Sequence, residues 1–129
     1  MALRATEGDK IGDSVEFWES IASTFKDNEY VFYELYNEPH LQDETTNDIY
    51  LNGDDTYVGM LEMIAAVRQH SKDQVLVIAG AKDWSFNNDS LIELDSKTDD
   101  TLIMYNYHAY MNPSNPKALK NADSLESYI

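Results

Sequence analysis

Apolar residues recur every three or four positions in two stretches of the chain, which predicts helices at residues 13–26 and about 54–70. The first would bury Val15, Trp18, Ile21, Ala22 and Phe25. The second would bury Tyr57, Leu61, Ile64, Ala65 and Val67. Asp13, and either Asp54 or Asp55, stand where a carboxylate oxygen can accept amide hydrogens of a first helical turn. A shorter helix is predicted at residues 88–94.

Three other segments predict strands. They are YVFYELY at 30–36, QVLVIA at 74–79 and TLIMYNY at 101–107. The first two are apolar on both faces, apart from Glu34, as in parallel strands that are covered by helices. The polar segment 40–53 is predicted to be a loop. The tail from Pro113 is expected to begin as loop and to become helical around residues 118–128.

Helices and strands alternate along the chain, and this order predicts an α/β fold. Alternating elements favour parallel strands joined by right-handed crossovers, so the three strands should lie side by side in sequential order. The chain has no internal repeat and no sign of a second domain.

Residues whose side chains suit catalysis or ligand binding follow all three predicted strands. Asn37-Glu38-Pro39 ends the first strand, Gly80 leads to Trp84 after the second, and His108 and Tyr110 end the third. Active sites of parallel α/β barrels lie at the carboxyl ends of the strands. The pattern therefore predicts one shared site on this rim, with the side chains of Glu38, His108 and Tyr110 directed into it.

Glu38 is the candidate general acid. Desolvation among aromatic neighbours such as Tyr36 would favour the protonated carboxyl that a general acid needs. Pro39 disfavours the α region for the residue before it, which predicts an extended backbone at Glu38. Asn37 offers an uncharged donor and acceptor for sugar hydroxyls. The same three residues also suit an ordinary turn at a strand end.

The other candidates each have a structural alternative. His108 and Tyr110 are two residues apart, so in extended backbone they point to the same side, as substrate ligands or as a half-buried aromatic pair. Trp84 could stack on a sugar ring, or could belong to the core or an interface.

Composition narrows the possible partners. The net charge of −15, from 24 acidic and 9 basic residues, argues against nucleic acid and anionic membranes as partners. No stretch approaches the ~20 apolar residues of a membrane span. The chain has no cysteine, which excludes disulfides and thiolate metal sites. The acidic loop 43–55 could hold calcium, but it fails the EF-hand pattern because Tyr50 takes the third position. No metal and no cofactor is predicted.

Taken together, these segments resemble family 5 glycoside hydrolases, which are cellulase-like enzymes. The stretches that carry the resemblance are FWESIASTFKDNEYVFYELYNEPH (17–40), QVLVIAGAKDW (74–84) and MYNYHAYMNP (104–113). The resemblance implies the acid/base role for Glu38 and a substrate contact for Asn37. His108 and Tyr110 would line the cleavage site, and Trp84 fits the family's pattern more loosely.

The resemblance implies a fold as well as an activity. The chain would be the central part of a (β/α)8 barrel, about strands four to six, with residues 1–129 forming an incomplete catalytic domain. Such a barrel needs about 250 residues. The family's nucleophilic glutamate on a later strand has no counterpart here, so the chain by itself is expected to be inactive. The full-length parent would be a secreted enzyme.

The resemblance leaves other readings open. The Asn-Glu-Pro motif is shared by mannanases and other β-glycanases of the same clan, so the glycan is not fixed. The chain could also be a non-catalytic carbohydrate-binding remnant that uses Trp84, Tyr110 and Asn37. In a partial barrel the outer strands expose unpaired edges, which predicts pairing with the missing strands or self-association.

Overall fold

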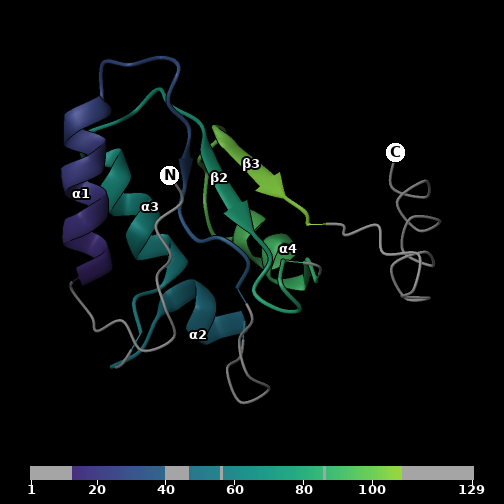
Figure 1. Cartoon of the computed structure of the whole chain (residues 1–129). Coiled ribbons are helices and arrows are strands. Elements are labelled where there is room, and N and C mark those ends of the chain that lie inside the picture. The colour runs from purple at the N-terminus through teal and green to yellow at the C-terminus, as the bar shows by residue number, and fades with distance from the viewer. Residues whose placement is uncertain (1–12, 40–46, 56, 86, 109–129) are drawn as a thin grey trace.

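The computed structural model describes residues 13–39, 47–55, 57–85 and 87–108 (Figure 1). The described strands are β1 (Tyr33–Glu34), β2 (Leu76–Ala79) and β3 (Ile103–Asn106), and they form a parallel sheet in the order β1-β2-β3. The described helices are α1 (Asp13–Phe25), α2 (Asn47–Asn52), α3 (Met60–Arg68) and α4 (Asp89–Asp95). The predicted α/β fold, with three parallel strands in sequential order, is confirmed.

The register of the sheet separates two faces. Tyr33, Leu76 and Ile103 lie in one row across the three strands. Tyr33 and Leu76 are fully buried against the helices. Successive side chains of a strand point to opposite faces, so the next row, which begins with Glu34, belongs to the face away from the core. The polar residues of that face are therefore available to a site.

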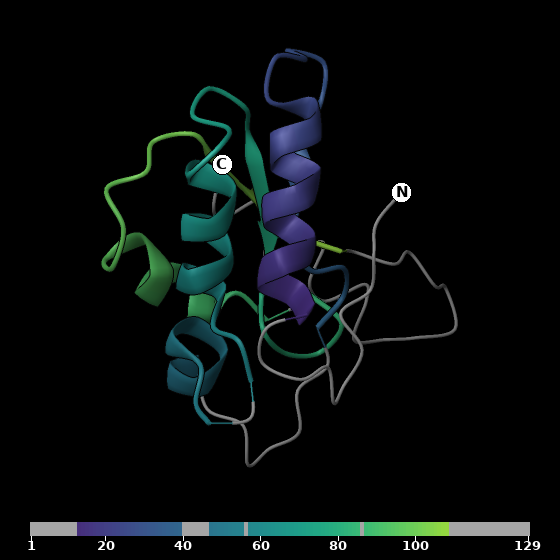
Figure 2. The ribbon, with the colours of Figure 1, turned by 90° about the vertical axis from the view of Figure 1, so that its left-hand side faces the viewer.

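The core lies between the sheet and its helices. Helices α1 and α3 stand side by side over one face of the sheet (Figure 2). The ring of Trp18 on α1 packs edge-on against Tyr33 of β1, with 6.3 Å between the ring centroids. The predicted face of α1 is confirmed at Trp18 and Ala22, which are buried, whereas Phe25 at the end of the helix is 40% exposed.

The segment after the first strand differs from the prediction. The predicted loop 40–53 contains helix α2, and the next helix begins at Met60 rather than at residue 54 or 55. The reason is a tight turn, in which the Asp54 carboxylate accepts the Tyr57 backbone N–H at 2.8 Å instead of capping a helix. Gly53, with φ +76°, closes this turn by pairing with Val58.

Two side chains predicted to be buried on the second helix are exposed. Tyr57 is part of the turn and is 42% exposed, and Ala65 lies on the outer side of α3. Ile64 and Val67 are buried as predicted, together with Met60, Met63 and Ala66. The buried side of α3 therefore runs through Met60, Met63 and Val67, and Leu61 is only partly buried against the core.

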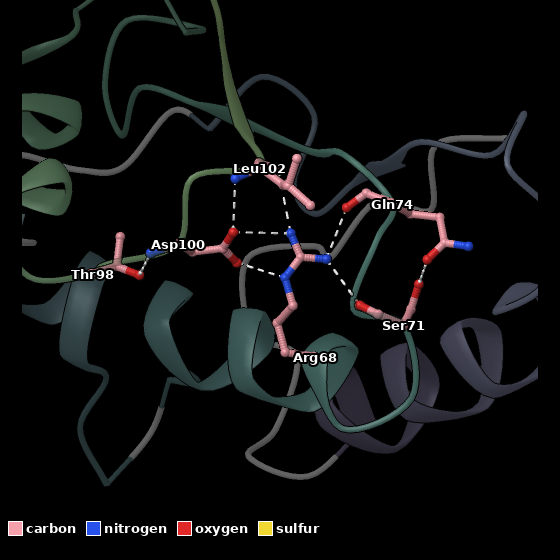
Figure 3. Close-up of polar contacts among 6 residues, drawn as sticks. All are labelled: Arg68, Ser71, Gln74, Thr98, Asp100 and Leu102. Carbon is pink, nitrogen blue, oxygen red and sulfur yellow. Dashed lines mark hydrogen bonds and ion pairs between the residues drawn. The ribbon is translucent and has the colours of Figure 1, made fainter.

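Arg68 joins the end of α3 to the beginnings of β2 and β3 (Figure 3). Its guanidinium donates to both carboxylate oxygens of Asp100, at 2.6 and 3.2 Å. It also donates to the carbonyls of Ser71 and Gln74 before β2, at 2.9 and 2.8 Å, and of Leu102 before β3, at 3.3 Å. This fork fixes the amino ends of two strands relative to one helix, at the end of the sheet opposite the candidate rim.

The described residues contain no helix that is both long and apolar enough to cross a membrane. The predicted helix at 118–128 and Tyr110 lie outside the described residues.

Candidate active site

Glu38 lies four residues after Glu34, just beyond the carboxyl end of β1. Its φ is +51°, so its backbone is left-handed and the predicted extended conformation is wrong. Pro39 excludes the right-handed α region, but the chain turns here through the left-handed region instead. Non-glycine residues rarely adopt this conformation, which costs of order 1–3 kcal/mol and is concentrated at functional sites. Pro39 is buried and anchors the turn.

The structure brings Glu38 and His108 together across the sheet. His108 Nδ1 lies 2.8 Å from Glu38 Oε1, although Glu38 follows β1 and His108 follows β3, and these strands are not adjacent. The side chain of His108 is 18% exposed and that of Glu38 is 24% exposed, so the pair is partly shielded from water. A carboxyl held in this way by an imidazole is oriented, and it can exchange a proton with a neighbouring group.

Two further side chains extend this contact. Asn106 Nδ2 donates to Glu34 Oε1 at 2.7 Å and also lies 2.8 Å from His108 Nε2. Glu34 Oε1 itself is 3.9 Å from His108 Nε2. Glu34, Asn106, His108 and Glu38 thus form one continuous polar chain on the face of the sheet away from the core.

The loop after β2 reaches the same rim. Lys82 and Asn87 pair across it, and Asp83, Trp84 and Ser85 between them all have positive φ. The Ser85 carbonyl accepts the His108 backbone N–H at 3.3 Å, which ties the loop to the end of the third strand. The side chain of Trp84 is 47% exposed on this loop.

Helix α2 contacts the carboxyl end of β2 through a hydrogen bond. The Tyr50 hydroxyl donates to the Ala79 carbonyl, the last residue of β2, at 2.7 Å. Tyr50 is buried, and burial raises the pKa of its phenol above the ordinary value, so it remains a donor. Close packing also requires glycine at position 80, because a Cβ there would lie 2.0 Å from the Asn87 carbonyl oxygen.

The sequence-based candidates meet different outcomes. Glu38 and His108 are in contact, and Asn37 is half-buried beside Glu38. Trp84 lies on a loop that touches the His108 backbone. Tyr110 falls outside the described residues, so its place at the site stays a prediction.

Sequence reasoning did not find Glu34 and Asn106. The signals were present, because Glu34 is the one charged residue of its strand and Asn106 is two positions before His108, on the same side of an extended chain.

No group of three metal-ligating side chains occurs within the described part of the chain. Of the acidic segment 43–55, residues 43–46 lie outside the described residues, and residues 47–55 form α2 and the start of the Gly53–Val58 turn.

Comparison with known proteins shows the family of the chain. The family model described as cellulase (glycosyl hydrolase family 5) matches residues 4–128. Endoglucanase A of Butyrivibrio fibrisolvens is 34% identical over 88% of this chain and 24% of its own length. Cellulase CelDZ1 of a Thermoanaerobacterium species is 30% identical over 74% of this chain, again 24% of its own length. The chain thus spans about a quarter of the length of these relatives.

Solved structures show the same fold. A structure named cellulase Cel5C_n superposes with a TM-score of 0.67 and 22% identity, covering 94% of this chain and 35% of that one. A second, named endoglucanase, has a TM-score of 0.58 and 24% identity over 76% of this chain and 28% of its own. The prediction of part of a (β/α)8 barrel is confirmed, and the chain belongs to the cellulase family, glycosyl hydrolase family 5.

Proposed function

We propose that this chain is the central part of the catalytic domain of a retaining β-glucanase, with Glu38 as its acid/base. The observation that carries the proposal is the contact between Glu38 and His108, which joins the Asn-Glu-Pro turn after β1 to the end of β3. Membership of the cellulase family supports a glycan as substrate, and two relatives named endoglucanase A and cellulase CelDZ1 support a β-linked glucan.

In this mechanism Glu38 acts twice. Its carboxyl first protonates the departing glycosidic oxygen, and its carboxylate later removes a proton from the water that releases the sugar. His108 holds one carboxylate oxygen of Glu38, so the second oxygen can face the substrate. Asn37 would bond a hydroxyl of the sugar, and Trp84 and Tyr110 would line the cleft.

The second carboxylate of a retaining enzyme stands about 5 Å from the first. Glu93 does not suit this role, because it lies on α4 and pairs with Lys97 at 3.5 Å. Glu126 lies outside the described residues. The proposal places the nucleophile on another strand of the whole protein, because Glu34 is engaged by Asn106 and no other carboxylate is described beside Glu38, and it expects no hydrolysis by this chain alone.

The whole protein would complete the barrel around this sheet. The edges of β1 and β3 would pair with its remaining strands, or with a second copy of this chain when those strands are absent. Because its substrate is an extracellular polymer, the whole protein would be secreted.

The test is to graft this segment into a related barrel that supplies the other strands. Hydrolysis of a soluble β-1,4-glucan is then measured for the grafted enzyme, for Glu38→Gln and for Glu62→Gln, a matched change on the exposed side of α3. Glu38→Gln should lower the rate by about 10²–10⁴-fold, the usual contribution of a general acid/base, and Glu62→Gln should have no effect. Equal rates for all three proteins would refute the role of Glu38. Turnover of a β-mannan but not of the glucan would reassign the substrate.

A further inference from the structure

We infer that Glu34 is a positioning residue: acting through the Asn106 amide, it keeps the proton of the neutral His108 ring on Nδ1, where it faces Glu38. The inference deepens the proposed function, and its value for catalysis rests on the role proposed for Glu38. It is carried by the four-residue polar chain on the outer face of the sheet.

The first step concerns the Asn106 amide. Its Nδ2 position lies 2.7 Å from Glu34 Oε1. An ionised carboxylate has no hydrogen to donate, so the atom that faces it must be the NH2 group and not the carbonyl oxygen. The charge of Glu34 therefore determines which of two orientations the Asn106 amide takes, although the two orientations have the same shape.

The second step concerns the His108 ring. The same Asn106 NH2 group lies 2.8 Å from His108 Nε2. A donor at this distance requires a lone pair on Nε2, because an N–H there would meet the N–H of the amide. In a neutral imidazole one nitrogen carries the proton, so it must be on Nδ1. That N–H then donates to Glu38 Oε1 at 2.8 Å.

The distances also explain why Asn106 is needed. Glu34 Oε1 is 3.9 Å from His108 Nε2, too far for a hydrogen bond between them. Without the amide in between, the Glu34 carboxylate would compete with that of Glu38 for the proton of the ring. A proton moved to Nε2 would leave Nδ1 with a lone pair toward Glu38, which would lose the donor that orients it.

The experiment reads the tautomer directly. Nitrogen-15 NMR distinguishes a protonated from an unprotonated ring nitrogen and identifies Nδ1 and Nε2 by their couplings to the ring hydrogens. The full chain is labelled, spectra are recorded in mildly alkaline buffer, and His108 is assigned by the signals lost in His108→Gln. The expected result for the unaltered chain is Nδ1–H.

Two variants and a control complete the design. Glu34→Met removes the acceptor, frees the amide to turn its oxygen toward Nε2, and should move the proton to Nε2. Asn106→Asp places a carboxylate oxygen at Nε2 without changing the shape, and it should do the same. Asn28→Asp is the matched control, because Asn28 is exposed and uses only its Oδ1, to accept the Tyr30 N–H, so His108 should not change.

The outcomes are distinct. A proton on Nε2 in the unaltered chain would overturn the inference, as would an unchanged Nδ1–H in Glu34→Met. If Glu34→Met does not fold, Glu34→Leu takes its place, and Asn106→Asp tests only the step through the amide. No hydrolysis is measured, so a failure of the acid/base role of Glu38 leaves this result standing, and the reverse also holds.

Discussion

Arg68 shows at the scale of one residue how this fold is held. Its side chain is only 18% exposed and satisfies a carboxylate and three carbonyls with one planar group (Figure 3). A lysine carries the same charge but cannot donate in a fixed fork. The shape of the guanidinium, as well as its charge, should therefore set the strength of this junction.

We expect Arg68→Lys to lower the free energy of unfolding by about 1–3 kcal/mol, because bonds to a charged group are lost and carbonyls are left poorly paired. Urea denaturation measures the change. Lys97→Ala is the control, since it removes only the exposed pair with Glu93 at 3.5 Å and should cost at most about 0.5 kcal/mol. Similar losses in the two variants would contradict this account of Arg68.

Asp100 should make stability depend on pH. Burial raises the pKa of its carboxyl, but the hydrogen bonds from Arg68 and from the Leu102 N–H, with the charge of Arg68, outweigh burial and hold the pKa below 3.8. A lowered pKa stabilises the folded chain above that ordinary value, and the contribution is lost as the pH falls through the folded value. Between about pH 5 and pH 2, Asp100→Asn should therefore lose less stability than the unaltered chain. Parallel pH curves in denaturant titrations would refute this.

Single residues differ in how far the sequence predicts them. Glu38 and His108 could be predicted because they end strands whose carboxyl ends share one rim. The left-handed backbone of Glu38 could not, because a following proline removes one region of conformation without choosing among the others. Glu34 and Asn106 were missed because Glu34 contacts Asn106 and Asn106 contacts His108, and only the three-dimensional arrangement defines those contacts.

Among the elements, helix α2 was the least predictable. Its six residues, Asn47–Asn52, are too few to show a helical period, and they lie within a polar segment. The helix is stabilised by tertiary contacts, as Leu51 is fully buried and Tyr50 bonds the end of β2. By contrast, the continuous apolar run of β2 predicted a buried parallel strand within two residues of its observed limits.

Tyr50→Phe tests whether α2 supports the rim. Loss of the hydrogen bond to the Ala79 carbonyl should lower the free energy of unfolding by about 1 kcal/mol and increase hydrogen exchange in the loop after β2. Tyr30→Phe is the matched control, because Tyr30 is 88% exposed, and it should stay within about 0.5 kcal/mol of the unaltered chain. Equal exchange in the loop of both variants would show that α2 does not hold it.

At the scale of the whole molecule, the two faces of the sheet differ among the described residues. Helices α1 and α3 cover one face (Figure 2), which is apolar and packed, whereas the polar chain from Glu34 to Glu38 lies on the other face. On β3, Met104 remains 49% exposed. The three strands and their order followed from the alternation of elements, whereas this chain spans only 24% of the length of endoglucanase A of Butyrivibrio fibrisolvens.

The most direct test of the acid/base role of Glu38 compares two substrates in the grafted barrel. Glu38→Gln should lower the rate of the glycosylation step far more for a substrate with a poor leaving group than for an activated aryl glycoside, whose leaving group needs little protonation. Azide should then restore turnover of the activated substrate and give a β-glycosyl azide, because a small anion replaces the water that Glu38 can no longer activate. Equal losses on both substrates, with no azide product, would contradict the assignment of Glu38 as the acid/base.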